Sequence, residues 1–357
     1  MAKRVLIVGR GKSGEASANA LAREGWNVDF VDNYQMVVMS PGVAVKSELQ
    51  LGCEELKRRG WKLIAITGSK GKSSVVKLIA EALGGIPCGN YGVPVSSLIQ
   101  EKPGWAVVEV SSFQLEATTL SPDTFEAAAI LNLQEDHLDR HGSKAIYHAL
   151  KLKLLTFAKK AFLPFSEKDF PSSDQQLFAG SYFDNEVLKA NAMTAIAVMR
   201  ETGLDDAAIV RAFAMFRPLP HRFEMVAERR GVKYIDDSKA TSIAALGAGV
   251  KMGGENIWLI AGGLAKGDDP NMVNLLLTKR VKKVYLIGQS AEAFASAWRN
   301  CTECEVVGTM EKAVEKAKHE AVEGGLVLLS PGAASFDQFK NFEERGEVFA
   351  RLANQEG

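Results

Sequence analysis

Several features that define other protein classes are missing from this sequence of 357 residues. It has only four cysteines, too few for the disulfide framework of a small secreted protein. No apolar run approaches the roughly 18 residues that a membrane-spanning helix needs, and Gly9 and Arg10 interrupt the apolar start of the chain. The 43 basic residues are balanced by 43 acidic ones, which argues against a broad basic surface. We therefore expect a cytoplasmic protein with no secretory leader, no membrane insertion and no nucleic-acid partner.

Two patterns that could indicate zinc are incomplete. Cys301 and Cys304 form an isolated C-x-x-C, to which the nearby sequence adds only His319 as a nitrogen or sulfur ligand. A structural zinc ion needs four ligands. His137 and His141 are spaced as on one face of a helix, but no glutamate follows His137 as it does in zinc proteases. Neither pattern therefore predicts a zinc site.

Strands and amphipathic helices alternate along the chain, which predicts an α/β protein with parallel sheets. The length exceeds one ordinary core, and three segments each begin with an apolar strand. We expect domains over residues 1–60, 61–217 and 218–357, with prolines stiffening the last connection. In the third segment, strands are expected at 233–236, 257–261, 283–287 and 326–330.

The most informative stretch is 64–76, where an apolar strand enters a glycine-rich turn that opens a helix. Backbone amides in such a turn converge on an anion, and the helix N-terminus adds partial positive charge. Lys72 would reach the terminal phosphates of a nucleotide, and Ser73 would bind Mg²⁺. The glycines are closer than in the usual phosphate loop, as Gly68-x-x-Gly71. An ordinary strand–turn–helix with a solvated lysine is the alternative.

A second glycine motif, Gly9-x-Gly11-x-x-Gly14, follows the first predicted strand, and Asp32 ends the second. Alone, this pattern indicates a dinucleotide site, with the acid on a ribose hydroxyl. Only about 60 residues precede the phosphate loop, however, whereas a complete dinucleotide fold needs roughly six strands. We therefore expect a small domain that holds one nucleotide or diphosphate, and no nicotinamide cofactor. A tight turn without a ligand is the alternative.

Glu109 stands at the end of an apolar strand run, where a carboxylate is costly unless it is paired or bound to a metal. Mg²⁺ beside ATP would supply that partner. Lys151 lies on an amphipathic helix, and by spacing alone it would be taken as solvated.

Eight ordered stretches, which span nearly the whole chain, resemble the Mur ligases. They are 40–44 (SPGVA), 67–73 (TGSKGKS), 90–94 (NYGVP), 109–116 (EVSSFQLE), 135–140 (EDHLDR), 219–224 (LPHRFE), 237–241 (DSKAT) and 329–342 (LSPGAASFDQFKNF). The last stretch and 219–224 favour the branch of the family that adds D-glutamate. Two departures stand out: Lys70 occupies a position that is usually Asn, and only residues 33–39 separate Asp32 from Ser40. Whole elements of the first domain must therefore be missing, and UDP should have fewer contacts.

The resemblance implies an ATP-dependent ligase that joins D-glutamate to UDP-N-acetylmuramoyl-L-alanine through an acyl phosphate, in peptidoglycan precursor synthesis. It implies a short Rossmann-like first domain for UDP, a central ATP-binding domain of the P-loop ATPase type, and a Rossmann-like third domain for the amino acid. The partners would be small molecules, and we expect a monomer. Two alternatives stay open: a sister ligase that adds another amino acid or a folate-type glutamate, and a nucleotide-binding module without activity.

The same resemblance implies a set of site residues, position by position. The catalytic positions are Lys72, Glu109, His137, Lys151, Asn90 and Lys239. ATP would be held by Gly68, Ser69, Lys70, Gly71, Lys72, Ser73, Ser74, Asn191, Arg222 and Asp237. The UDP-linked substrate would be held by Gly11, Lys12, Ser13, Asp32, Asn33, Ser40, Pro41 and Gly42, and D-glutamate by Thr241, Lys266, Ser335 and Phe342. Two Mg²⁺ ions are implied, one on Ser73 and Glu109 and one on His137 and a carbamylated Lys151.

Overall fold

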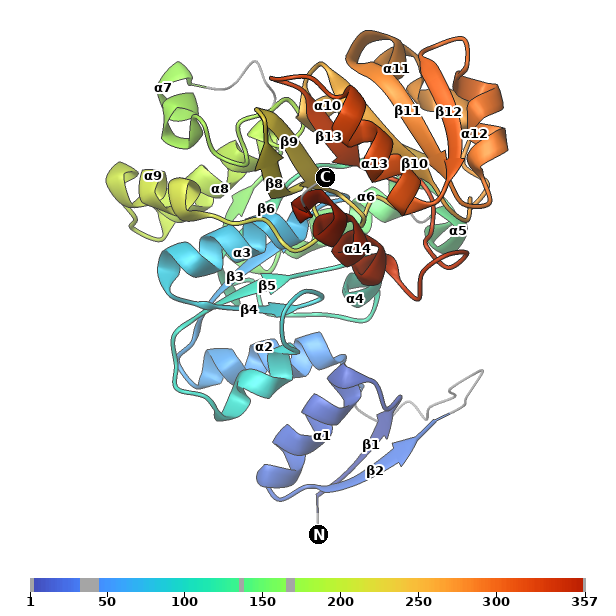
Figure 1. Ribbon diagram of the computed structural model, residues 1–357. Helices are drawn as coiled ribbons and strands as arrows, with labels where there is room; N and C mark the ends of the chain where they lie inside the picture. Colours follow the sequence, from blue (N-terminus) through green and yellow to red (C-terminus); the bar gives the residue numbers. More distant parts are fainter. Residues whose placement is uncertain (1–2, 33–44, 135–137, 165–170, 356–357) are drawn as a thin grey trace. The chain divides into compact units, whose positions relative to one another are not determined.

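The computed structural model describes residues 3–32, 45–134, 138–164 and 171–355 (Figure 1). The chain divides into two compact units. The first unit comprises residues 1–184 and 188–216, and the second comprises 185–187 and 217–357. No helix in the described ranges combines the length and the apolar character that crossing a membrane requires. A separate first domain over residues 1–60 stays a prediction.

Helices and strands alternate through the first unit, as the sequence predicts. In chain order they are β1 (Arg4–Val8), α1 (Lys12–Arg23), β2 (Asn27–Val31), α2 (Glu48–Arg58), β3 (Lys62–Thr67), α3 (Lys72–Leu83), β4 (Ile86–Gly89), η1 (Val95–Gln100), β5 (Trp105–Glu109), α4 (Ser112–Glu116), β6 (Phe125–Ile130), α5 (Leu138–His141), α6 (Lys144–Leu155), β7 (Ala158–Phe162), α7 (Ser172–Gln175), η3 (Gln176–Phe178), α8 (Lys189–Glu201) and α9 (Asp206–Met215).

The main sheet of the first unit is parallel and, within the described residues, has the strand order β4-β5-β3-β6-β7. β3 lies at its centre and is buried from Leu63 onward, which is why this strand is a continuous apolar run. From β3 the chain visits β4 and β5 on one side and then β6 and β7 on the other. The strand order therefore reverses at the carboxyl end of β3, the place where open α/β sheets bind ligands.

β1 and β2 form a separate parallel sheet, of two strands among the described residues. Side chains along both strands alternate between half-buried and exposed, as expected for a sheet with only one covered face. On the open face, Leu6 is 58% exposed, and Val8 and Val31 are also exposed. This small sheet agrees with the short first segment of the sequence.

The second unit is built on a second sheet, with helices between its strands. Its elements are β8 (Glu224–Arg229), β9 (Val232–Asp236), α10 (Ile243–Gly253), β10 (Ile257–Gly262), η4 (Pro270–Val273), α11 (Asn274–Arg280), β11 (Val281–Ile287), α12 (Ala291–Trp298), β12 (Glu303–Gly308), α13 (Met310–Glu320), β13 (Leu326–Leu329) and α14 (Phe342–Asn354).

In the described part of the second unit, the sheet has the order β12-β11-β10-β13-β9-β8, and only the edge strand β8 runs antiparallel to its neighbour. The four strands expected from the sequence are confirmed as β9, β10, β11 and β13, within two residues at each end. The edge strands β8 (EMVAER) and β12 (ECEVVG) were not predicted, because charged residues interrupt their apolar pattern.

Candidate active site

The phosphate loop lies where the main sheet of the first unit reverses its strand order. β3 ends at Thr67, and α3 begins at Lys72. The turn between them needs its glycines, because Gly68 has a φ of 151° and Gly71 a φ of 82°. A Cβ at Gly71 would also lie 2.1 Å from Asn191 Nδ2. The sequence prediction of a strand, a tight glycine turn and a helix over this stretch is therefore confirmed.

The charged side chains of the turn have different surroundings. Lys72 Nζ donates to the carbonyl oxygens of Gly68 and Ser69, at 3.0 and 3.2 Å. Lys70, which replaces the usual Asn, is exposed. The amides of Ser69 and Lys70, which we expected to hold phosphate, instead donate to the side chain of Asn132.

Glu109 ends β5, beside β3, and pairs in register with Ile66. Its side chain is buried, with 2% of the residue exposed. Oε1 accepts a hydrogen bond of 2.7 Å from Asn90 Nδ2, but Oε2 is buried with no hydrogen-bond partner among the residues that the structure describes. A buried carboxylate oxygen without a partner is costly, and a hard divalent cation would satisfy it. The chemistry of this group therefore fits Mg²⁺.

Lys151 reaches the same turn from α6. Spacing alone would place Lys151 in solvent, but the side chain is buried, with 1% of the residue exposed, and Nζ donates to the Gly68 carbonyl at 3.0 Å. The ammonium group lies 4.5 Å from the centre of the Tyr147 ring. The structure thus brings Lys151 to the turn between β3 and α3.

Five predicted site residues, His137, Asn33, Ser40, Pro41 and Gly42, lie outside the described residues. His141 is described and completely buried. Its Nε2 lies 3.0 Å from Ser112 Oγ, and its Nδ1 lies 3.0 Å from Glu116 Oε1. Nε2 is within hydrogen-bond distance of Ser112, whereas Nδ1 lies near the Glu116 carboxylate but makes no hydrogen bond within the described residues, so His141 joins α5 to α4.

The remaining predicted UDP residues lie around the first turn of α1 and the end of β2. Gly11, Lys12 and Ser13 are exposed at the helix start, and Asp32 is exposed just after β2. Lys12 also lines a groove between α1 and η1, together with Arg10, Arg23, Ser96 and Ser97. The serines come from a part of the chain that the sequence analysis did not associate with UDP.

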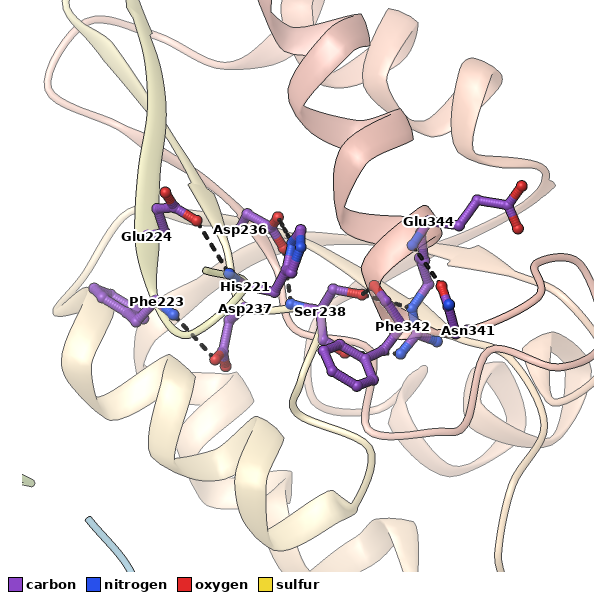
Figure 2. A network of polar contacts seen from close by, with 10 residues as sticks. His221, Phe223, Glu224, Asp236, Asp237, Ser238, Asn341, Phe342 and Glu344 are labelled. Carbon is purple, nitrogen blue, oxygen red and sulfur yellow. Dashed lines mark hydrogen bonds and ion pairs between the residues drawn. The ribbon is translucent and has the colours of Figure 1, made fainter. Parts of the chain in front are cut away.

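In the second unit, Arg222 sits in a strained turn just before β8. Its neighbours His221 and Phe223 both have positive φ values, 61° and 49°, which are unfavourable for residues with a Cβ. Figure 2 shows the bonds that hold the turn: the His221 amide donates to Glu224 Oε2 at 3.0 Å, and the Phe223 amide donates to Asp237 Oδ1 at 3.2 Å. The turn fixes the backbone of a residue predicted to contact ATP.

Asp236 is the last residue of β9, and a second carboxylate, Asp237, follows it directly. Asp236 Oδ2 lies 2.7 Å from His221 Nδ1, and Asp236 Oδ1 accepts from the Ser238 amide at 2.9 Å. Removal from water raises the pKa of Asp236. It also raises the pKa of Asp237 to about 7, although the Ser330 hydroxyl donates to Asp237 Oδ2 at 2.9 Å. His221, Glu224 and Asp236 could hold a metal by their spacing, but each already bonds within the turn.

Among the predicted D-glutamate residues, Thr241 and Lys266 approach one another, and Phe342 lies near His221, with the ring centres 6.1 Å apart. Lys266 Nζ lies 3.4 Å from Thr241 Oγ1, and Ser335 is 2% exposed. Lys239 Nζ lies over the ring of Phe342, 3.6 Å from its centre. Desolvation lowers the pKa of Lys239, the charges of Arg222 and Lys266 lower it further, and the charge of Glu343 opposes them. The positive charges of Arg222, Lys239 and Lys266 are close enough to repel one another, and such a cluster favours a ligand with several negative charges.

Arg345, which is fully buried in α14, is a further residue of this region that was not predicted from the sequence. Its guanidinium donates to Ser238 Oγ, Ser238 O and Ala333 O, at 2.9, 2.9 and 3.1 Å, and burial lowers its pKa to about 10. The Ser238 hydroxyl in turn donates to the Phe342 carbonyl at 2.8 Å. Arg345 therefore joins the segments that carry Lys239 and Phe342. An arginine within an amphipathic helix gives no sequence signal for such burial.

Two family models match the chain: the Mur ligase middle domain over residues 66–176, and the Mur ligase, glutamate ligase domain over residues 221–332. The UDP-N-acetylmuramoylalanine–D-glutamate ligase of Haemophilus ducreyi is 34% identical over 391 aligned positions, which cover 94% of this chain and 87% of that protein. The protein of the same name from Francisella philomiragia is 31% identical over 399 positions, which cover 98% of this chain and 96% of its own.

Solved structures show the same fold at lower identity. A MurF ligase from Thermotoga maritima, in complex with ADP, superposes with a TM-score of 0.62 at 16% identity, and covers 99% of this chain and 96% of its own. The bifunctional folylpolyglutamate synthase/dihydrofolate synthase of Yersinia pestis superposes with a TM-score of 0.58 at 17% identity, over 88% of this chain and 95% of its own.

Proposed function

Because the chain belongs to the Mur ligase family, we propose that it joins D-glutamate to UDP-N-acetylmuramoyl-L-alanine with hydrolysis of ATP. The product is a precursor of peptidoglycan, the polymer of the bacterial cell wall. Relatives that carry the name of this activity match nearly the whole chain, with identities of 31 to 34%.

The observation that carries the proposal is the convergence of three groups at one end of β3. The phosphate loop, the unpartnered Oε2 of Glu109 and the buried ammonium of Lys151 come from three separate parts of the chain. A loop for phosphate beside an unsatisfied carboxylate is what a nucleotide with a divalent cation requires. Buried carboxylate oxygens in proteins usually have a partner, so an ordinary strand–turn–helix does not account for this one.

The chemistry follows from the poor reactivity of a carboxylate toward an amine. The carboxylate oxygen of the alanyl group attacks the γ-phosphorus of ATP, the bond to ADP breaks, and an acyl phosphate forms. The amine of D-glutamate then attacks the acyl carbon, and phosphate leaves as the amine loses a proton. Lys72 acts on the transferring phosphoryl group, whose charge must be neutralised, and Asn90 and Lys239 act near the reacting carboxylate and phosphate.

Mg²⁺ would be held by Ser73 and Glu109, and a second ion by His137 and a carbamate on Lys151. These ions would supply charge neutralisation for the phosphates. A carbamate replaces an ammonium by an oxygen-rich anion, which is a suitable ligand for a hard cation. The support for this role of Lys151 is its burial beside the Gly68 carbonyl.

The amino acid would bind in the second unit, near Thr241, Lys266, Ser335 and Phe342. D-glutamate brings two carboxylates, and charge-assisted hydrogen bonds to carboxylates are among the strong ones in proteins. The charges of Arg222 and Lys266 lower the pKa of Lys239, so the three cations lie near one another. This proximity supports an anionic ligand there. In the family pattern, Asn191, Arg222 and Asp237 would contact the adenine and ribose of ATP.

We further propose a short Rossmann-like first domain over residues 1–60, a central ATP-binding domain over 61–217 and a Rossmann-like third domain over 218–357. The first would hold UDP through the Gly9–Gly14 turn and residues 40–42. The enzyme would work as a monomer in the cytoplasm, where ATP and UDP-linked precursors are found. The groove between α1 and η1, which Lys12 and Arg23 line together with an Arg10–Glu15 ion pair, supports an anionic ligand near the first segment.

One assay tests the proposal against its alternatives. Phosphate release from ATP is measured with UDP-N-acetylmuramoyl-L-alanine and a panel of amino acids, with and without Mg²⁺. We expect release that depends on Mg²⁺ and D-glutamate. Release with another amino acid would indicate a sister ligase, and none with any amino acid would indicate a binding module. Saturable binding of NAD in calorimetry would contradict the assignment of the first segment to UDP.

A further inference from the structure

Asn132 follows β6 and lies beside the phosphate loop, and its side chain bonds to both the amide and the carbonyl of one loop residue, Lys70. Its Oδ1 accepts from the amides of Lys70 and Ser69, at 2.9 and 3.0 Å, and its Nδ2 donates to the Lys70 carbonyl at 2.9 Å. The Ser69 amide is also 3.2 Å from the backbone oxygen of Asn132. The carboxamide thus pairs with Lys70 as a neighbouring strand would.

A second asparagine extends this support along the turn. Asn132 Nδ2 lies 3.3 Å from Asn191 Oδ1, and Asn191, from α8, is 4% exposed. Asn191 also fills the space beside Gly71, where a Cβ would clash with its amide nitrogen. The two carboxamides therefore contact consecutive residues of the turn, 70 and 71.

This turn needs support from outside itself. Gly68 and Gly71 flank Lys70, and both have positive φ values. Glycines give a chain the greatest conformational freedom, so such a turn is ordered only by contacts with its surroundings. The partners of Ser69 and Lys70 determine the direction in which the N-terminus of α3 points.

We propose that Asn132 is a positioning residue for the phosphate loop. It holds the backbone of Ser69 and Lys70 against the end of β6, so that the N-terminal amides of α3 keep pointing toward the nucleotide phosphates. This inference rests on the proposed use of ATP at this loop. It predicts that Asn132 contributes to nucleotide affinity without touching the nucleotide.

The test compares variants of the full-length enzyme by calorimetry with ADP and Mg²⁺ and by steady-state kinetics. In Asn132→Ala, the Kd for ADP and the KM for ATP should rise roughly tenfold or more, since several hydrogen bonds to the loop are lost. The KM values for D-glutamate and the UDP-linked acceptor should change less than twofold. Asn132→Gln, which keeps the amide but shifts it by one methylene, should show the same selective loss.

Thr124→Val is the matched control, because Thr124 precedes the same strand at its opposite end. Its hydroxyl donates to the Ser121 carbonyl at 2.8 Å, and the residue is 4% exposed. The control loses one buried hydrogen bond, so its unfolding temperature should fall while its Kd for ADP stays at the wild-type value. If Thr124→Val raised the Kd for ADP as much as Asn132→Ala does, the weaker ADP binding would reflect a general loss of stability, and the proposal would be overturned.

Hydrogen exchange in the wild type gives a test that needs no variant. The Lys70 amide donates to Asn132, so it should exchange slowly before ADP is added. Fast exchange there, or Asn132 variants that bind ADP as well as or better than the wild type, would overturn the inference alone. A wild-type enzyme that binds no ADP would refute the proposed function, and the inference with it.

Discussion

Burial of Asp237 predicts how the free energy of unfolding depends on pH. Its carboxylate accepts from the Phe223 amide and the Ser330 hydroxyl, yet removal from water raises its pKa from 3.8 to about 7. The neighbouring charge of Asp236 adds to the rise, and Arg222 opposes it. Between pH 4 and 7 the folded state therefore keeps a proton that the unfolded chain has released, and ionisation of Asp237 destabilises the fold.

The magnitude is limited by the size of the shift. Each pKa unit corresponds to about 1.4 kcal/mol, so a shift from 3.8 to about 7 sets an upper limit of about 4 kcal/mol. Part of the side chain remains exposed, which screens the charge, so we expect about half of that limit. The stability of the wild type should fall as the pH rises from about 4 to about 7 and lose nothing more from this group above about 8.

Asp237→Asn removes the titration and keeps the shape. The amide oxygen still accepts from Phe223, and the Ser330 hydroxyl can turn to accept from the new amide nitrogen. In urea denaturation of the full chain, the stability of the variant relative to the wild type should grow by about 1–3 kcal/mol between pH 5 and pH 8. Asp123→Asn, at an exposed turn, is the control and should show no such growth. A difference that is equal at both pH values would refute the reasoning.

Three further predictions concern the proposed reaction. Lys151→Ala should lose most activity in the phosphate-release assay and regain part of it with added short carboxylates, which can replace carbamate oxygens. Lys72→Ala should not be rescued in this way. A fully active Lys151→Ala would contradict the carbamate. Gly11→Leu should raise the KM for the UDP-linked acceptor and leave the KM for ATP nearly unchanged; a Cβ at Gly11 meets nothing within 4 Å, so an equal rise in both would identify the turn as structural. Lys266→Ala and Ser335→Ala should each lower kcat/KM for D-glutamate roughly ten- to a hundredfold, the loss of one charge-assisted hydrogen bond, while acyl-phosphate formation survives. Normal D-glutamate use by both variants, or equal use of L-glutamate by the wild type, would refute this assignment of the amino-acid site.

Central strands and the phosphate loop could be predicted from the sequence because their signals are local. β3 is buried from Leu63 onward and carries an apolar run at 63–66, and the turn after it carries glycines that its φ values require. The edge strands β8 and β12 could not be found in this way, since a strand with one partner tolerates charged residues. The functions of the site residues came from the resemblance to a family and not from spacing.

The missed residues act through contacts between distant parts of the chain. Arg345 bonds to Ser238, 107 positions away, and Asn132 bonds to Lys70, 62 positions away. Neither an arginine in a helix nor an asparagine after a strand differs in sequence from its many solvated counterparts. Only the fold shows that both lie against segments predicted to bind substrates.

The small sheet of β1 and β2 should unfold locally more easily than the main sheet of the first unit. Two strands with one exposed face are marginally stable alone, whereas β3 is covered on both sides. The amides of β1 and β2 should therefore exchange through local opening, at a lower free energy than those of β3 and β6. A molecule that binds along α1 and β2 would stabilise this segment directly. Its occupancy would then be visible as slower exchange or proteolysis at the start of the chain, even when the reaction itself does not proceed.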